Sequence, residues 1–332
     1  MPIRVLHVGL GPIGLAVVSQ VAGRKGFRSV GGVDIDPAKA GRDLADVAGL
    51  PGRLRAKVSD DLRAALKRTR PDVAVLCTGS SLKVVEPQVE TILKARVPIV
   101  STTEEMAYPV GKNRRVAKRI DARARRAKVG VLGTGVNPGF AMDALPIVLT
   151  GVCERVDAIR VERVQDAGVR RLPFQQKIGA GLTVEEFQAR VEAGTVRHVG
   201  LAESVSMIAA AVGWKLDRIT DDIRPKIAAS AIGSPFLTVE AGRVCGLEQD
   251  GVGYVGEEPV VSLHMEAYLG APESYDAVEI SGSPSLSMKI AGGVHGDVAT
   301  ASMVVNSIPK VIDGPPGFHT MRDLPIPSFA GG

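Results

Sequence analysis

Short apolar runs alternate with amphipathic stretches through the first 140 residues. The apolar runs cover residues 3–8, 27–33, 72–77, 97–101 and 129–132. Most of the segments between them repeat apolar residues at helical spacing. Strands that alternate with helices in this way predict a parallel sheet covered by helices on both faces. The expected fold class is therefore α/β, with a Rossmann-type doubly wound parallel sheet.

From about residue 156 the pattern changes to more polar strands with longer connections. Strands are expected at residues 158–164, 219–225, 237–246, 259–267 and 276–282, with an apolar helix at 198–212. Alternating polarity in such strands is typical of a mostly antiparallel sheet with one covered face. A second apolar helix begins near residue 298. We predict an α+β substrate and dimerisation domain over residues 141–295, and a dinucleotide-binding domain over residues 1–140 to which residues 296–332 return, with a cleft between the domains.

A glycine-rich loop, Gly9-Leu-Gly-Pro-Ile-Gly14, joins the first strand directly to the first helix. This spacing, between a strand and a helix, is the dinucleotide-binding fingerprint. Gly9 makes the tight turn, Gly11 lets the backbone approach a pyrophosphate, and Gly14 lets the helix pack close to the strand. The helix N-terminus offers N–H groups to the phosphates. Pro12 and Ile13 complete the predicted cofactor loop.

Asp34 stands at the end of the second strand, 20 residues after Gly14. A carboxylate there can accept hydrogen bonds from both ribose hydroxyls and repels a 2′-phosphate, which favours NAD over NADP. Lys39 and Arg42 follow in the same loop and could bind a phosphate, so NADP stays open. The competing role for Asp34 is turn or helix-cap chemistry, for which Asp36 is the better candidate.

Polar residues follow the next three predicted strands, at the edge where open α/β sheets bind ligands. Thr78, Gly79 and Ser80 follow residues 72–77 and are expected either along the cofactor or as a helix cap. The strand at residues 97–101 leads into a predicted cofactor contact and two adjacent carboxylates, which are Thr103, Glu104 and Glu105. Asn137 lies in a glycine-rich loop, where it offers an amide to a nicotinamide or substrate carbonyl, or serves as a turn residue before Pro138.

Composition and charge exclude several classes of protein. The chain has 332 residues, 45% of them hydrophobic, and a formal net charge of +5, which suits two α/β domains. It has no apolar run of membrane-spanning length and no room for a signal peptide before its first strand. Three isolated cysteines argue against disulfides and a zinc site. We therefore expect a cytoplasmic protein without a metal and without a membrane partner.

Residues 112–128 carry nine basic residues against one Asp, but no aromatic residue is interleaved for base stacking. Alanine and valine recur at helical spacing between the charges. This pattern favours a solvated amphipathic helix over a nucleic-acid surface. No partner nucleic acid is expected.

The chain resembles the 2,4-diaminopentanoate dehydrogenase and native amine dehydrogenase family, which is related to dihydrodipicolinate reductase and homoserine dehydrogenase. The resemblance covers nearly the whole chain and rests on several separate motifs. These are the glycine loop with Val33-Asp-Ile-Asp-Pro, Ser101-Thr-Thr-Glu-Glu-Met-Ala-Tyr-Pro109, Gly133-Thr-Gly-Val-Asn-Pro-Gly-Phe140, Gln176-Lys-Ile-Gly-Ala-Gly181, His295-Gly-Asp-Val-Ala-Thr300 and Met321-Arg-Asp-Leu-Pro325. The resemblance implies reductive amination of a ketone or aldehyde with ammonia by a nicotinamide cofactor.

The family's glutamate aligns with Glu104, with Glu105 as the fallback. A carboxylate suits this chemistry because the ammonium that loses a proton and the iminium that forms are both cations. Its competing role is a helix cap or a first-turn carboxylate. Further residues are predicted in the substrate cleft, namely Glu105, Phe140, Lys177, His264 and Thr300. Arg163, Arg171 and Lys177 are candidates for binding a carboxylate of a 2-amino-4-oxopentanoate substrate.

Two other functions stay open from the sequence. One is an alcohol or semialdehyde dehydrogenase that needs no ammonia, and the other is a dinucleotide-binding sensor without catalysis. By analogy with relatives of this fold, we expect a homodimer formed through the sheet of the second domain.

Overall fold

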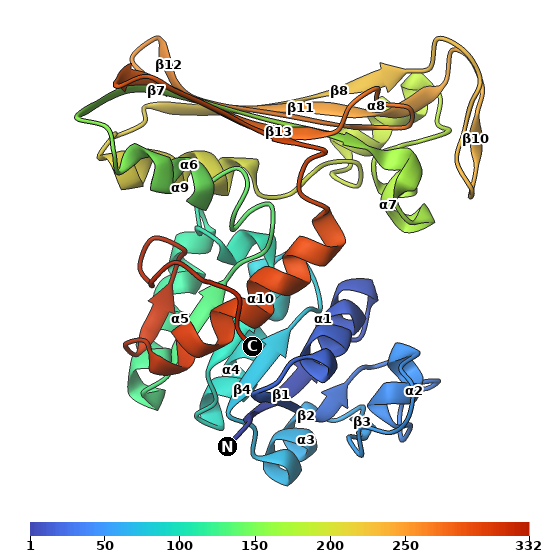
Figure 1. The fold of residues 1–332 in the computed structure, drawn as a ribbon, viewed down its shortest axis with the longest axis vertical. Helices are drawn as coiled ribbons and strands as arrows, with labels where there is room; N and C mark the ends of the chain where they lie inside the picture. Colours follow the sequence, from blue (N-terminus) through green and yellow to red (C-terminus); the bar gives the residue numbers. More distant parts are fainter. Residues whose placement is uncertain (332) are drawn as a thin grey trace. The chain divides into compact units, whose positions relative to one another are not determined.

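The computed structural model describes residues 1–331 and divides them into two compact units (Figure 1). Unit 1 comprises residues 1–140 together with the chain from residue 295 onward, and unit 2 comprises residues 141–294. The chain therefore leaves unit 1 after Phe140 and returns to it at His295. None of the helices in residues 1–331 has the length and apolar character needed to cross a bilayer.

Within the described residues, unit 1 is built on a seven-stranded parallel sheet with the order β15-β6-β5-β4-β1-β2-β3. Its strands are β1 (Ile3–Val8), β2 (Phe27–Val33), β3 (Val58–Ser59), β4 (Val73–Leu76), β5 (Ile99–Ser101), β6 (Gly130–Gly133) and β15 (Gly317–His319). Its helices are α1 (Pro12–Gly23), α2 (Leu44–Ala48), α3 (Leu62–Thr69), α4 (Leu82–Lys94), α5 (Asn113–Ala127) and α10 (Gly296–Asp313), with the 3-10 turn η1 (Glu104–Met106). The predicted α/β class is confirmed, and β3 and β15 are additions that the sequence did not indicate.

Helices cover both faces of this sheet. Leu66, Val85 and Ile120 pack α3, α4 and α5 against one face. Val17 of α1 and Val304 of α10 belong to the core on the opposite face. Strands buried on both sides need continuous apolar sequence, which explains the uninterrupted valine-rich runs.

Unit 2 contains a six-stranded sheet with the order β14-β13-β7-β12-β11-β8, counted over residues 141–294. Only β12 and β7 pair in parallel there, and the other neighbours are antiparallel. Its strands are β7 (Arg155–Asp166), β8 (Arg218–Ile227), β11 (Val244–Val255), β12 (Glu258–Tyr268), β13 (Tyr275–Ser283) and β14 (Leu286–Ala291), and a small ribbon joins β9 (Ile232–Gly233) to β10 (Thr238–Val239). The helices are α6 (Ala144–Thr150), α7 (Leu172–Lys177), α8 (Val184–Glu192) and α9 (Leu201–Val212), with the 3-10 turn η2 (Ala167–Val169).

The strand predicted at residues 237–246 is wrong in its position. The chain turns after β10, and the long strand β11 starts only at Val244. The strand β11 contains three glycines, a residue type that disfavours strands. Their role is close packing: a Cβ on Gly253 would lie 2.7 Å from Val205 Cγ1, and one on Gly251 would lie 3.0 Å from Leu201 Cβ. Glycine therefore lets α9 lie directly on the sheet.

Candidate functional site

The glycine loop between β1 and α1 has little room for side chains at two of its three glycines. Gly9 has φ +88°, and a Cβ there would lie 2.5 Å from the carbonyl oxygen of Cys77. A Cβ on Gly14 would overlap the carbonyl oxygen of Gly9. Both positions therefore need glycine for the fold itself, as a tight turn and a close helix contact require.

Gly11 is different, because the packing of the fold does not require a glycine at this position. It is the N-cap of α1, Pro12 follows at the first helical position, and a Cβ on Gly11 would have no atom within 4 Å. Gly79, in the loop after β4, is equally open. Open space at two glycines beside a helix N-terminus fits a pyrophosphate that approaches the backbone. The residues present therefore fit a dinucleotide.

Asp34 is anchored at the end of β2. Its Oδ2 accepts the N–H of Leu10 at 2.8 Å and lies 3.1 Å from Lys39 Nζ, while Oδ1 accepts the N–H of Asp36 at 3.0 Å. Burial raises the pKa of this carboxyl, but the hydrogen bonds from Asp36 and Leu10 and the ammonium of Lys39 outweigh it, so the pKa lies below its usual value. Asp34 is therefore ionised at neutral pH and fixed next to the glycine loop.

Glu105 caps a helix that belongs to another segment. Its Oε2 accepts the N–H of Leu82, the first residue of α4, at 2.7 Å, and its own N–H donates to the carbonyl of Ser80 at 3.2 Å. Ser81, the formal N-cap, makes no side-chain cap bond. Glu105 therefore caps α4, and both Glu104 and Glu105 lie in the first turn of η1.

Glu104 begins η1 at the end of β5. Burial raises the pKa of the Cys77 thiol to about 11, and the charge of Glu104 adds to that rise against a hydrogen bond with Thr102. Leu76 pairs with Ser101, so Cys77 and the turn that begins at Glu104 follow neighbouring strands at the same edge of the sheet, where the carbonyl oxygen of Cys77 lies against Gly9. The Cys77 thiol itself stays protonated at neutral pH and is no nucleophile.

Buried hydroxyls join the loops that carry these groups. Thr103 Oγ1 donates to the carbonyl of Gly79 at 2.8 Å, and Ser101 Oγ bonds to Thr103 Oγ1 at 3.0 Å and to the Leu76 carbonyl at 3.0 Å. Thr103 is 1% exposed, so it positions the cofactor loop from behind. Ser101 was not among the predicted site residues, although the run of three hydroxyl residues that starts at the end of β5 was a visible signal. The hydroxyl of Thr78 is held by Gln88 Oε1 at 2.5 Å.

The loop after β6 joins the same edge. A Cβ on Gly133 would meet Met106 of η1, so glycine permits the close contact between this loop and the turn that carries Glu104. The N–H of Val136 donates to Thr300 Oγ1 at 3.3 Å, which brings α10 beside the loop. Asn137 and Phe140 lie half-buried in or next to that loop. The structure thus gathers most of the predicted residues of unit 1 at the carboxyl ends of β1, β2, β4, β5 and β6.

The site residues predicted in unit 2 lie away from the glycine loop in the chain and have different partners. Arg163 is 2% exposed and forms an ion pair with Asp276, and its Nη2 donates to the carbonyl of Val294 at 2.8 Å. It is therefore not available to a substrate carboxylate, and that candidate role is wrong. The sequence could not indicate this ion pair, because Asp276 lies 113 residues away from Arg163 in the chain.

His264 belongs to an ion network on the unit 2 sheet. Its Nδ1 lies 2.6 Å from Asp250 Oδ1 and its Nε2 lies 3.0 Å from Glu266 Oε1. Its strand neighbours Leu263 and Met265 are buried and point the other way, on the side that α9 contacts. We therefore leave His264 out of the proposed site. Lys177, at the end of α7, is exposed and lines a small cavity with Arg197 and His198.

Comparison with known proteins assigns the chain to a family. A model of the 2,4-diaminopentanoate dehydrogenase C-terminal domain matches residues 140–331. A 2,4-diaminopentanoate dehydrogenase of Acetoanaerobium sticklandii is 35% identical over 332 residues, which cover 98% of this chain and 94% of that protein. The chain belongs to the 2,4-diaminopentanoate dehydrogenase family. The resemblance drawn from the sequence is thereby confirmed.

Solved structures agree with this assignment. An amine dehydrogenase from Mycobacterium smegmatis is similar with a TM-score of 0.88 and 27% identity, covering 100% of this chain and 98% of that one. A dipicolinate-bound dihydrodipicolinate reductase from Paenisporosarcina sp. TG-14 shares the fold, with a TM-score of 0.54, 15% identity and coverage of 97% and 99%. The family is one of NAD(P)-dependent dehydrogenases that act on amine groups.

The glycine geometry yields a test that separates binding from folding. We expect Gly11→Ala to keep the thermal stability of the protein, because its Cβ enters open space at an allowed φ of −73°. The same Cβ obstructs the pyrophosphate, so we expect about tenfold or greater loss of NADH affinity, measured by fluorescence titration. Gly14→Ala is the matched control and should instead lower the melting temperature, because its Cβ overlaps the Gly9 carbonyl. Unchanged NADH affinity in Gly11→Ala would remove this loop from the cofactor site.

Proposed function

We propose that this chain is an amine dehydrogenase that takes substrates of the 2,4-diaminopentanoate type and uses Glu104 as its catalytic carboxylate. The observation that carries the proposal is the division of labour between two neighbouring carboxylates. Glu105 is committed to the N-terminus of α4, while Glu104 begins η1 at the edge of the sheet where Cys77 and the glycine loop also lie. The substrate class follows from the relative that is 35% identical over nearly the full length of both chains.

The chain's own residues have defined tasks in reductive amination. When bound, a nicotinamide dinucleotide supplies the hydride. Glu104 accepts a proton from ammonium, which frees ammonia to add to the carbonyl carbon of the substrate. The protonated Glu104 returns that proton to the hydroxyl of the carbinolamine, which leaves as water and gives the cationic iminium. The regenerated carboxylate stabilises this cation until the amine forms. A lysine in place of Glu104 would repel both cations, so the charge of this residue fits amine chemistry.

The reaction is tested by NADH consumption with 2-amino-4-oxopentanoate and with short aliphatic ketones, each with and without ammonium. We expect turnover that depends on ammonium and prefers the amino acid. Turnover without ammonium would instead indicate an alcohol or semialdehyde dehydrogenase, and NADH binding without any turnover would indicate a sensor.

The same assay tests Glu104. We expect Glu104→Gln to lower kcat about 100-fold or more, because it removes the base and the negative charge but keeps the side-chain shape. NADH affinity should change by less than about twofold, since Glu104 is not among the groups that bind the phosphates or the ribose. Glu105→Gln is the matched control, because its amide oxygen can still accept the N–H of Leu82 and turnover should persist. Loss of turnover in the control alone would reverse the assignment.

We further propose that the cofactor is NAD rather than NADP. Asp34 supports this preference because its lowered pKa keeps the carboxylate ionised above its usual value of 3.8 and therefore throughout the assay range. Lys39 is engaged with that carboxylate at 3.1 Å, and a 2′-phosphate would face the negative charge. We expect Asp34→Ser to raise the KM for NADH about tenfold or more and to lower the KM for NADPH. A wild-type enzyme that prefers NADPH would contradict the proposal.

A homodimer through the unit 2 sheet is also proposed. The sheet face that carries His264 is rich in half-buried, mutually paired ions, and Lys226 Nζ lies 3.0 Å from both Glu248 and Glu266. A face whose charges are already compensated can be covered by its own copy about a two-fold axis without leaving an unpaired charge. Light scattering in solution should give twice the chain mass of 34.8 kDa. A mass of one chain at micromolar concentration would contradict the dimer.

A further inference from the structure

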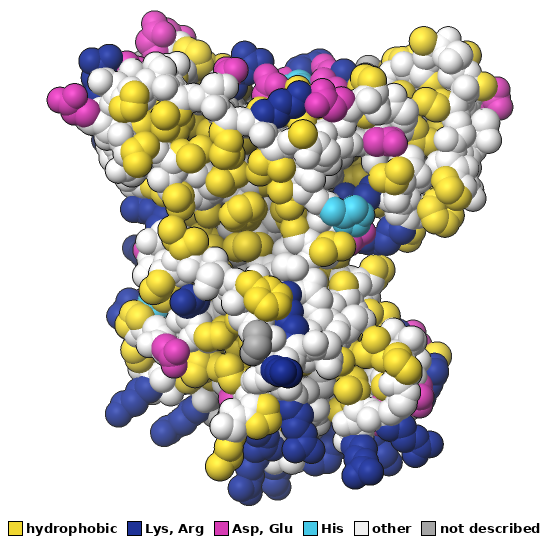
Figure 2. All heavy atoms as spheres, in the orientation of Figure 1, with side chains coloured by type: hydrophobic (Ala, Val, Ile, Leu, Met, Phe, Trp, Pro, Cys, Tyr) yellow, Lys and Arg dark blue, Asp and Glu magenta, His cyan; other side chains and the backbone are white. Residues whose placement is uncertain are grey.

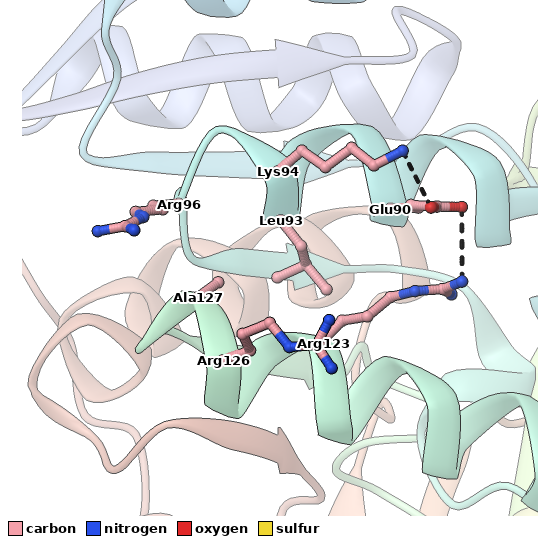
Figure 3. Close-up of a pocket in the computed structure, with 7 residues that line it drawn as sticks. All are labelled: Glu90, Leu93, Lys94, Arg96, Arg123, Arg126 and Ala127. Carbon is pink, nitrogen blue, oxygen red and sulfur yellow. Dashed lines mark ion pairs between the residues drawn. The ribbon is translucent and has the colours of Figure 1, made fainter.

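A basic groove crosses the carboxyl ends of α3, α4 and α5 in unit 1. It consists of two adjoining hollows of about 540 Å³ and 270 Å³, which share Lys94 and Arg96. The cations of the larger hollow are Arg63, Lys67, Arg70, Lys94 and Arg96, and in the described residues no carboxylate lines it. Figure 3 shows the smaller hollow, where Leu93 reaches from α4 toward Arg123 and Arg126 on α5.

Most of the positive charge in this groove has no counter-charge. Lys94 lies 3.0 Å from Glu90, and Arg123 lies 3.3 Å from Glu86 and 3.7 Å from Glu90. Throughout residues 1–331, no carboxylate forms an ion pair with the other five cations, Arg63, Lys67, Arg70, Arg96 and Arg126, and all five are exposed. A short run of like charges without partners raises the local potential for an anion.

The charge of the chain is concentrated in the unit that holds this groove. Unit 1 contains 27 Lys and Arg against 15 Asp and Glu, whereas unit 2 contains 14 against 21. The modest net charge of +5 is therefore the sum of a strongly basic unit and an acidic one. Lys and Arg side chains gather along the lower edge of unit 1 in Figure 2.

The groove lies at the edge of the sheet opposite the cofactor loops. Pro71 and Val97, which precede β4 and β5, help to line the larger hollow, so it opens where these strands begin. The glycine loop follows the end of β1, and the parallel strands run from one edge to the other. An anion in the groove would therefore not occupy the dinucleotide site.

Helix dipoles account for only part of this arrangement. Cations near a helix carboxyl end stabilise it by about 0.3–1 kcal/mol. Arg63, however, lies in the first turn of α3, where a cation opposes the dipole. Arg70 and Arg96 have φ values of +42° and +58°, a region that favours glycine at the end of a helix. Local stability therefore does not select arginine at these positions.

We propose that this groove binds an anion with several phosphates in line, either a short inorganic polyphosphate or the polyphosphate of a nucleotide, held by its phosphates alone. The larger hollow has the volume of a small-molecule site. Arginine forks match phosphate oxygens in bidentate geometry. No aromatic side chain lines either hollow among the described residues, so the groove offers no stacking surface for a base. The proposal is independent of the proposed reaction.

Calorimetric titration of the NADH-saturated enzyme with tripolyphosphate tests the site. Saturation with NADH keeps the glycine loop from binding the probe. We expect binding that weakens between about 50 mM and 200 mM salt, and a loss of about tenfold or more in the double variant Arg70→Gly with Arg96→Gly. The two substitutions should leave the melting temperature of the protein unchanged or raise it, because glycine suits a positive φ.

Lys128→Gly is the matched control. Lys128 ends α5 with φ +60° and carries the same charge, but it lines neither hollow. The affinity of the Lys128→Gly variant for tripolyphosphate should stay within about twofold of that of the wild-type protein. ATP should bind about as well as tripolyphosphate, and adenosine should not bind.

Four results would overturn the proposal. These are no saturable binding at millimolar tripolyphosphate, equal weakening by Lys128→Gly, weaker binding of the probe when the NADH concentration is raised beyond saturation, and much tighter binding of a single-stranded oligonucleotide than of tripolyphosphate at matched charge. The second would indicate a diffuse effect of net charge, and the fourth would indicate a nucleic-acid surface.

Discussion

Loops at the carboxyl edge of the parallel sheet can approach one another only because glycines stand where their backbones meet. Gly9 makes room for the Cys77 carbonyl, Gly14 for Gly9 itself, and Gly133 for Met106 of η1. Loops that follow different strands, and are remote in sequence, are thereby in van der Waals contact at one edge of the sheet. A side chain on Gly133 would displace the turn that carries Glu104, and one on Gly9 or Gly14 would displace the glycine loop or Cys77. The chemistry of the site depends first on this absence of side chains, and only then on its polar groups.

The adjacent carboxylates Glu104 and Glu105 have different structural surroundings. Glu105 satisfies the N–H of Leu82, which belongs to a helix that starts 23 residues earlier. Such a cap, donated from another segment, removes a helix-end penalty of about 1 kcal/mol and fixes the turn before it. Glu104 lies in the same 3-10 turn, at the edge of the sheet where Cys77 follows β4. The structural residue therefore orients the proposed catalytic one.

The sequence predicted what is local and missed what is distant. Strand–loop–helix order sufficed for β1, β2, β4, β5 and β6 of unit 1 and for the position of Asp34 directly after β2, because each signal lies within one segment. The sequence could not distinguish Glu104 from Glu105, since the helix that needs a cap is remote. The position of β11 was missed because the partners of its glycines, Leu201 and Val205 of α9, come from another element. Arg163 resembled a ligand for the same reason, as its partner Asp276 is distant in the chain.

Basic residues occupy every non-glycine position with positive φ in residues 1–331, namely Arg55, Arg70, Arg96 and Lys128. Asparagine and glycine are the residues that usually tolerate this conformation. A favourable helix-dipole term of about 0.3–1 kcal/mol roughly offsets the conformational cost of about 1 kcal/mol, so stability alone does not select arginine or lysine there. Three of the four end helices on the same face of the sheet, and two of those line the basic groove. Where local stability is indifferent, an anion at that edge supplies the missing reason for the charge.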